Sequence, residues 1–109
     1  MKSLKGITAM KGKVKGPVHL ITDPGAMVVA KKGIILVAPY TTPLMTLAIS
    51  EAVGLVTDFG GITSHAAIVA REFGIPCVVN TKDATKVLKQ GQTITIDADT
   101  GVVFYDDKS

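Results

Sequence analysis

The chain has 109 residues, of which 47% are hydrophobic and 19% charged, and its formal net charge is +3. This length suffices for one domain with a modest core, so we expect residues 1–109 to form a single domain. The small charge, with no aromatic residues interleaved among the N-terminal lysines, predicts no nucleic-acid partner. No apolar run approaches the roughly 18 residues of a membrane span, so no membrane partner is expected. The single cysteine, Cys77, excludes an internal disulfide and is compatible with the cytoplasmic location that we expect.

The first third of the chain is predicted to be mainly strand. Residues 1–12 carry an indistinct pattern that fits a strand only in part. Residues 13–21 alternate between apolar and polar side chains, which predicts a half-buried strand, and Pro17 favours a place at a sheet edge or a bulge. Residues 27–30 can form another short strand. The continuous apolar run of residues 33–38 predicts a strand that is buried on both faces.

The middle of the chain is predicted to begin with a helix and return to a strand. Thr42 followed by Pro43 forms an N-cap and N1 pair, so we expect a helix over residues 43–52. Its inward face would hold Leu44, Leu47 and Ala48. Residues 55–57 then form a short buried strand that leads to a pair of glycines.

The last third alternates between strands and a short helix. Residues 77–79 form a buried strand in which Cys77 is a small core residue. Asp83 is expected to cap a helix over residues 84–88, and residues 93–105 form a hairpin. Strand–helix units in the middle and hairpin-like strands at the end predict an α/β fold with a mixed sheet.

Residues 58–76 hold the most informative pattern in the chain. Thr63 or Ser64 can serve as an N-cap, because a side-chain oxygen can accept from the first free N–H groups of a helix. Apolar residues then recur at spacings of three and four, which predicts one buried helical face. Gly74 suits the left-handed position after a helix, and Pro76 cannot continue it. The buried face would hold Ala66, Val69, Ala70 and Phe73.

His65 therefore falls in the first turn of this helix. Free N–H groups and the positive end of the helix dipole favour an anion there. Gly60 and Gly61 allow a close approach of the backbone just before it. The imidazole could bind or steer an anion, or it could attack phosphorus and carry a phosphoryl group covalently. A third interpretation is a helix-start histidine that forms only local hydrogen bonds.

The uninterrupted run from Gly60 to Pro76 resembles the motif of the mobile, or swivelling, phosphohistidine domain of phosphoenolpyruvate-utilising enzymes. That family includes phosphoenolpyruvate synthase, pyruvate phosphate dikinase and enzyme I of the sugar phosphotransferase system. The resemblance covers roughly residues 12–105, which would be the core of the domain. It implies a layered β/β/α swivelling-domain fold and identifies His65 as the phosphorylated nucleophile.

Phosphoryl transfer depends on positioning and electrostatics more than on covalent help from the protein. The groups that could stabilise the phosphate are those of Gly60, Gly61, Thr63, Ser64 and Ala66. Capping of the helix alone is an alternative role for the two hydroxyls. In pyruvate phosphate dikinases the threonine two residues before the histidine is a regulatory phosphorylation site, and Thr63 matches that place.

Two further charged residues frame the motif. Arg71 lies on another side of the helix from His65 by its spacing and could contact the phosphates or an acidic surface of a partner. The alternative for Arg71 is an ion pair with a nearby carboxylate. Asp58 can orient the loop, although an aspartate before glycines is common in turns for local reasons.

The chain lacks the other parts that whole enzymes of this family contain. A nucleotide-binding domain and a phosphoenolpyruvate-binding barrel do not fit in 109 residues. There is no Walker-type lysine motif and no metal-ligand spacing, so we expect no metal and no cofactor bound by this chain. The resemblance implies partner domains or subunits that hold Mg²⁺ and ATP or phosphoenolpyruvate.

We therefore expect a phosphohistidine carrier that moves a phosphoryl group between a nucleotide site and a phosphoenolpyruvate/pyruvate site on its partners. It would be a component of a pyruvate, water dikinase-like phosphotransferase that does not complete catalysis alone. It could be an excised domain or a stand-alone carrier. The alternatives are a non-catalytic regulatory module and an anion-binding module of the same fold.

Overall fold

A computed structural model describes residues 1–29 and 31–106 of the chain. Its strands are β1 (Lys2–Lys5), β2 (Ile7–Met10), β3 (Lys13–Leu20), β4 (Ile35–Ala38), β5 (Gly54–Thr57), β6 (Cys77–Val79), β7 (Thr93–Asp97) and β8 (Val102–Tyr105). Its helices are the 3₁₀ helix η1 (Pro43–Met45) and the α-helices α1 (Thr46–Glu51), α2 (His65–Phe73) and α3 (Ala84–Val87). Within the described residues, none of these helices has the length and apolar character to cross a membrane.

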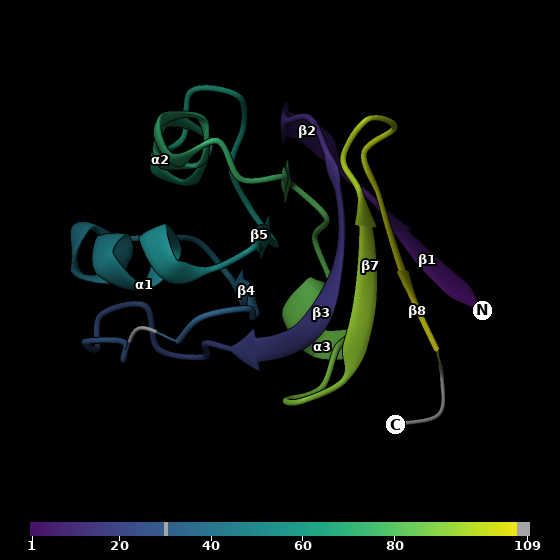
Figure 1. The fold of residues 1–109 in the computed structure, drawn as a ribbon, viewed down its shortest axis with the longest axis horizontal. Helices are drawn as coiled ribbons and strands as arrows, with labels where there is room; N and C mark the ends of the chain where they lie inside the picture. The colour runs from purple at the N-terminus through teal and green to yellow at the C-terminus, as the bar shows by residue number, and fades with distance from the viewer. Residues whose placement is uncertain (30, 107–109) are drawn as a thin grey trace.

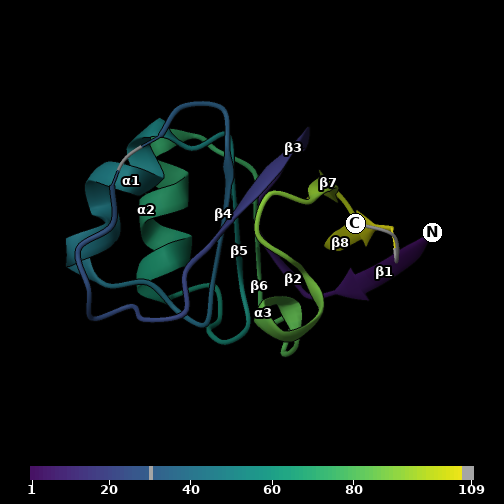
Figure 2. The ribbon, with the colours of Figure 1, turned by 90° about the horizontal axis from the view of Figure 1, so that it is seen from below.

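The strands form two sheets that share β3, in the order β1-β8-β7-β3-β4-β5-β6-β2. Strands β3 to β6 pair in parallel, whereas the pairs on the β1–β8–β7–β3 side and the β2–β6 pair are antiparallel. Helices α1 and α2 lie together on one side of the β4–β5–β6 strands, and β7, β8 and β1 lie on the other side (Figure 1). The view from below separates the layers as helix, sheet and sheet (Figure 2). The α/β fold with a mixed sheet and the layered β/β/α arrangement are thus confirmed.

Strand β3 changes its partner along its length. Residues from Lys13 to Pro17 pair with β7, and residues from Val18 to Leu20 pair with β4. Although β3 lies inside the overall strand order, the part that contains Pro17 pairs on one side only, so its predicted place at a sheet edge is confirmed. The N–H of Val18 donates to Gln92 O on the β7 side. Because successive N–H groups of a strand point to opposite sides, the missing N–H of Pro17 falls on the β4 side, before that ladder begins.

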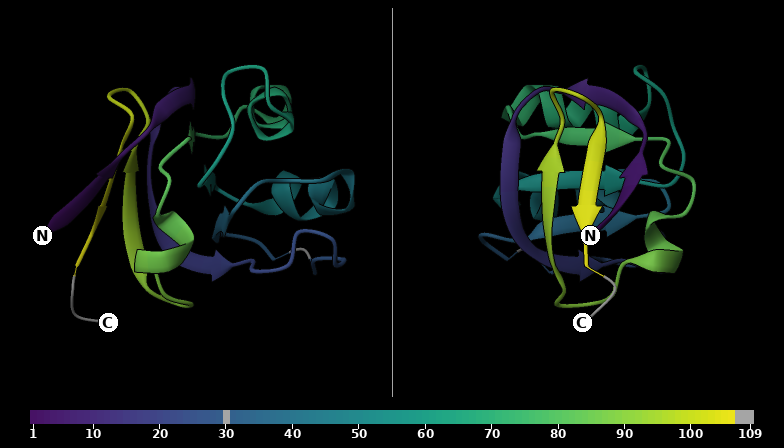
Figure 3. Two further views of the ribbon diagram at one scale, coloured as in Figure 1. Left: turned by 180° about the vertical axis from the view of Figure 1, so that it is seen from behind. Right: turned by 90° about the vertical axis from the view of Figure 1, so that its right-hand side faces the viewer.

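The first twelve residues, predicted to be strand only in part, form two strands that belong to different sheets. Strand β1 pairs with β8, and β2 pairs with β6, so the chain passes between the sheets at Gly6. The N–H of Gly6 donates to Gly101 O at 2.9 Å. Figure 3 shows this N-terminal segment running across the side where the two sheets meet.

Strand β4 is the centre of the core, as its apolar run predicted. All four of its residues are fully buried. Leu36 and Ala38 pack in the cluster under α1 and α2, and Ile35 and Val37 pack in the cluster between the two sheets. Side chains that alternate along a strand face opposite layers, so this one strand contributes to both clusters.

Cys77 in β6 is also fully buried, as predicted for a small core residue. This burial raises the pKa of its thiol to about 12.

The helix predicted over residues 43–52 is present, but its inward face is different. Leu44 and Leu47 are 48% and 71% exposed, while the buried residues are Met45, Ala48 and Ile49. Together with Ala52 these buried residues follow the i, i+3, i+4, i+7 spacing of one helical face, so Ala48 is confirmed and the rest of the predicted face is displaced by one position. The hydroxyl of Thr42 forms no cap and donates instead to Pro24 O at 2.9 Å.

Two smaller expectations also need correction. Residues 27–29 form no strand, and Ala30, which completed that predicted segment, lies outside the described residues. Phe73, expected on the buried face of its helix, is 42% exposed, whereas Ala67 joins that face fully buried. The strands expected at residues 55–57, 77–79 and within 93–105 are confirmed.

The passage at Gly6 gives a first prediction. A Cβ placed on Gly6 would lie 2.3 Å from Val79 O and 2.8 Å from Val78 Cγ1, so backbone must move to admit it. We expect Gly6→Ala to lower the free energy of unfolding by about 1–3 kcal/mol, measured by urea denaturation. Gly25→Ala is the matched control, since the nearest atom to its added Cβ lies at an ordinary 3.4 Å. Equal stability of the two variants would contradict the crowded passage.

Candidate functional site

The loops after β4 and β5 lie side by side at one edge of the sheet. The two strands are parallel, with Ala38 opposite Thr57, so their carboxyl ends meet at that edge. The N–H of Asp58 donates to Ala38 O at 3.1 Å, and the N–H of Phe59 donates to Pro39 O at 3.0 Å. The segment that leads to His65 is thereby fixed against the segment that holds Thr41.

His65 is the first residue of α2, and its ring is held by Thr41. The hydroxyl oxygen of Thr41 lies 2.7 Å from Nδ1 of His65. Thr41 is only 7% exposed, and His65 is partly buried. When Nδ1 carries the proton and donates to Thr41, the lone pair of Nε2 is left free, and Nε2 has no partner among the described residues. This tautomer has a nucleophilic nitrogen.

Sequence reasoning missed Thr41. Its hydroxyl lies 24 positions from His65 in the chain, and its own surroundings suggest only a loop. The sequence nevertheless contained a signal for this contact. Thr41 follows a strand buried on both faces, and the carboxyl ends of neighbouring parallel strands lie at the same edge of the sheet. A polar residue after one such strand is a candidate partner for a polar residue after the next.

The start of α2 offers backbone N–H groups. Ser64 is the N-cap, and its Oγ accepts from Ala67 N at 3.4 Å and donates to Gly61 O at 2.7 Å. The N–H groups of His65 and Ala66 find no acceptor within residues 1–29 and 31–106. Unpaired N–H groups at a helix start attract anions. The side chain of Ala66 is buried, so only its N–H is available for this purpose.

The loop before the helix is open on its outer side. Gly60 has a φ of +115°, and a Cβ there would lie 3.0 Å from both Cβ and Oγ of Ser64, so glycine is required. A Cβ on Gly61 would meet nothing within 4 Å. The side chain of Thr63 is exposed, and its hydroxyl has no partner in the part of the chain that the structure describes. Thr63 is therefore accessible, whereas Ser64 is used as the cap.

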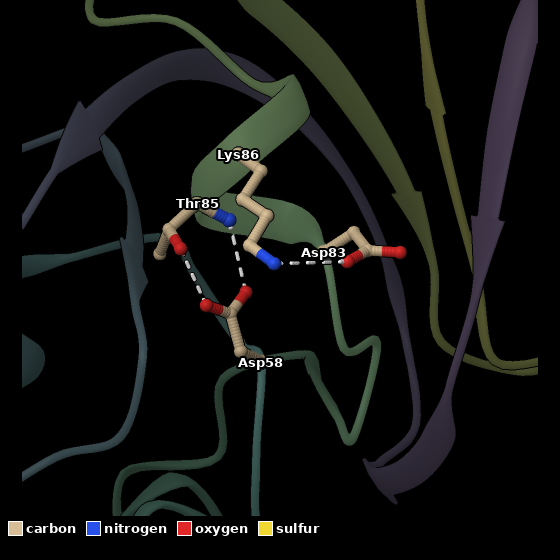
Figure 4. A network of polar contacts seen from close by, with 4 residues as sticks. All are labelled: Asp58, Asp83, Thr85 and Lys86. Atoms are coloured by element: carbon tan, nitrogen blue, oxygen red, sulfur yellow. Dashed lines mark hydrogen bonds and ion pairs between the residues drawn. The ribbon is translucent and has the colours of Figure 1, made fainter.

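Asp58 fastens the start of the loop to α3. Its carboxylate is 3% exposed and accepts from Thr85 N at 2.9 Å and from the Thr85 hydroxyl (Figure 4). The carboxylate thus caps α3 from outside the helix. Asp83, predicted to be the cap, occupies the N-cap position without a side-chain bond, and its carboxylate lies 3.9 Å from Lys86 Nζ at the surface.

Arg71 binds two backbone carbonyls and does not form the local ion pair that was one of its two predicted contacts. Its Nε donates to Ala9 O at 3.1 Å, and its Nη2 donates to Ile62 O. No carboxylate of the described residues forms an ion pair with it, so the predicted alternative of a local ion pair is wrong. The guanidinium joins strand β2 to the loop before His65.

The second histidine is in a different place. His19 lines an open cavity of about 430 Å³ with residues of the 20–31 segment, and His65 is not part of that lining. Burial, and then the charge of Lys31, lower the pKa of His19 below its ordinary value. Nowhere in residues 1–29 and 31–106 do three or more His, Cys, Asp or Glu side chains gather closely enough to hold a metal ion.

The family model of the phosphoenolpyruvate-utilising enzyme mobile domain matches residues 30–101, which include the whole of this site. The chain belongs to the phosphoenolpyruvate-utilising mobile-domain family. It is 50% identical over 101 residues to phosphoenolpyruvate synthase of Pyrococcus furiosus and 45% identical over 98 residues to the uncharacterized phosphotransferase YvkC of Bacillus subtilis. These matches cover 93% and 90% of this chain but only 12% of each relative, so the chain spans about an eighth of their length.

Solved structures agree with membership of the mobile-domain family. The solution structure of Enzyme I (nEIt) is 33% identical in sequence to this chain and superposes with a TM-score of 0.61. The match covers 70% of this chain and 32% of the Enzyme I chain. Aconitase X of Thermococcus kodakaraensis gives a TM-score of 0.71 over 97% of this chain and 99% of that one, at 23% identity. At that identity the likeness to aconitase X shows the shared fold alone.

Thr41 gives a prediction about the ring of His65. In Thr41→Val the shape is kept but Nδ1 loses its partner, so the two neutral tautomers should both be populated. Two-dimensional ¹H–¹⁵N spectra of the imidazole above its titration range would show this as averaged nitrogen shifts. Thr41→Ser, which keeps the hydroxyl, should retain the spectrum of the parent chain, and an unchanged spectrum in Thr41→Val would contradict the contact.

The capping of α3 gives a prediction about two aspartates. Asp58→Ala leaves both donors of the partly buried Thr85 unpaired, and we expect a loss of about 1–3 kcal/mol in unfolding free energy. Asp83→Ala removes only an exposed contact and should cost less than about 0.5 kcal/mol. Urea denaturation of the two variants measures both values. The reverse order would show that Asp83 is the functional cap.

Proposed function

We propose that this mobile domain carries a phosphoryl group on Nε2 of His65. The observation that supports this most strongly is the contact between Thr41 and Nδ1, because with the proton on Nδ1 it leaves the lone pair of the other ring nitrogen free to attack. The free N–H groups of His65 and Ala66 lie at the same helix start. They would donate to the oxygens of an incoming phosphoryl group and offset the charge that develops on them.

The transfer step is a displacement at phosphorus. The Nε2 lone pair forms the N–P bond while the P–O bond to the donor breaks. The electron pair of the P–O bond leaves with the donor oxygen. The proton on Nδ1 stays in its bond to Thr41, so the ring carries a positive charge for as long as phosphorus is bound to Nε2, next to the negative oxygens of the phosphoryl group. In the return step the N–P bond breaks, and the phosphoryl group passes to an acceptor oxygen. Ser64 would act mainly by holding the helix start, and Gly60 by allowing the turn.

Partner domains or subunits would supply the donor and the acceptor. The two relatives are about eight times longer than this chain, and they are named a phosphoenolpyruvate synthase and a phosphotransferase. We infer that the partners hold a nucleotide site and a phosphoenolpyruvate/pyruvate site, together with Mg²⁺, in the cytoplasm. Thr63 is exposed and a Cβ on Gly61 would meet nothing within 4 Å, so the outer side of the loop is open for such a partner. The same exposure makes Thr63 a candidate for regulatory phosphorylation.

The chain contains two histidines, which makes the test direct. Phosphoramidate transfers a phosphoryl group to imidazole without any partner protein, and its P–N bond breaks with loss of ammonia. We expect it to add one acid-labile, base-stable phosphoryl group to the chain, seen by intact-mass and ³¹P NMR measurement. His65→Gln should abolish this product, and His19→Gln should retain it.

A second arm tests the carrier role itself. Labelled phosphoenolpyruvate and a Pyrococcus furiosus phosphoenolpyruvate synthase deprived of its own mobile domain should label the parent chain and not His65→Gln. Label that persists in His65→Gln would refute the assignment of the nucleophile. A chain that binds the truncated enzyme but takes no label from either donor would instead be a regulatory module, and one that binds inorganic phosphate without covalent change would be an anion-binding module.

A further inference from the structure

The contacts of Arg71 link three segments that are distant in the sequence. Arg71 is near the end of α2, Ala9 lies in β2, and Ile62 lies in the loop before His65. Helix α2 packs against β2 and β6 (Figure 1). The guanidinium thus spans from the edge strand of the sheet to the middle of the loop that presents the histidine.

The bond to Ala9 has a structural origin in a β-bulge. Thr8 is opposite Val78 and Met10 is opposite Cys77, so Ala9 is an extra residue in β2. A bulged residue leaves the regular ladder, and its carbonyl needs another donor when it is shielded from water. Arg71 Nε supplies this bond at 3.1 Å. Because the guanidinium is planar, fixing Nε also fixes the direction of its other donors.

The bond to Ile62 acts on the loop. Ile62 O accepts from no other donor among the described residues. The other hydrogen bonds of the loop join Phe59 to Pro39 and Thr57, and join Gly61 O to the N–H and the hydroxyl of Ser64. Gly60 has no hydrogen bond among the described residues, and a glycine backbone can take many conformations. Among the described residues, Arg71 therefore provides the hydrogen bond that holds the middle of the loop to another part of the fold.

We propose that Arg71 is a positioning residue for phosphoryl transfer: anchored on the bulge carbonyl of Ala9, it fixes Ile62 and so keeps the loop and helix start in the geometry that receives the phosphoryl group. This inference rests on the proposed function of His65. Charge-assisted bonds to two carbonyls are stronger than neutral ones and use the fork of the guanidinium, which an ammonium cannot reproduce. The guanidinium does not need to touch phosphate in this role.

Phosphoramidate separates positioning from partner contact, because it brings no protein surface. Arg71→Met keeps the aliphatic stem and removes the donors, and we expect its rate constant for His65 phosphorylation by phosphoramidate to fall roughly 10-fold or more. Arg71→Lys should recover only a small part of that rate. Glu72→Gln, a change at the neighbouring exposed residue, is the matched control and should react as the parent chain does.

The loop is observed directly in the same variants. Amide ¹⁵N order parameters of Gly61, Ile62 and Thr63 should fall from about 0.85 to below about 0.6 in Arg71→Met, while those of β4 and β5 stay unchanged. The phosphoramidate rate and the order parameters are both measured under conditions in which circular dichroism shows each variant to be fully folded. If Arg71→Met does not fold, the same two measurements are made on Arg71→Lys.

Three results would overturn the inference. An unchanged phosphoramidate rate, with slower transfer only from a protein donor, would make Arg71 a partner contact. A full rate in Arg71→Lys would show that charge alone is needed. A slower rate with unchanged loop order parameters would exclude action through Ile62. Failure of the proposed function is a separate outcome, since the parent chain would then take no phosphoryl group, while the order parameters would still report whether Arg71 holds the loop.

Discussion

Burial of both faces of the central parallel strands is the constraint on which the rest of the structure depends. Strand β4 sends alternate side chains into the helix layer and into the second sheet, and all of them are fully buried. Such strands have no exposed face that could carry polar chemistry. Polar groups are therefore confined to the strand ends, where the segments that hold Thr41, Asp58 and His65 come together. The layered fold thus decides where the site can be.

The loop before His65 is held from three directions by contacts of different kinds. Asp58 joins its beginning to α3, Arg71 holds its middle to the edge strand, and Thr41 orients the histidine ring from the neighbouring loop. Each tie satisfies a buried or otherwise unpaired polar group, so each contributes to stability as well as to geometry. Preorganised donors need no rearrangement when charge develops on a substrate, which is why a well-fastened loop suits phosphoryl transfer.

The comparisons separate what the fold implies from what the site implies. Aconitase X of Thermococcus kodakaraensis shares the fold over nearly the whole chain at 23% identity, which says nothing about shared chemistry. The mobile-domain family model matches residues 30–101, the stretch of this chain that holds His65, the two glycines and the helix cap, and the two relatives are 45–50% identical to the chain. Around His65 the scaffold supplies Thr41 and the free N–H groups, and these features, more than the fold, support the assignment of function.

The sequence by itself determined the buried strands, the helix that has His65 in its first turn and ends before Gly74, the C-terminal hairpin and the family. These features are local: an apolar run, a cap and a glycine at a φ of +67° depend on neighbouring residues only. The tertiary structure alone decided that Thr41 meets His65, that Asp58 caps α3 in place of Asp83, and that Arg71 binds carbonyls. These contacts join residues 9 to 62 positions apart, and they depend on strand register, on the bulge in β2 and on how the loops meet at the sheet edge. No local pattern contains that information, because side-chain partners are set by the packing of whole layers.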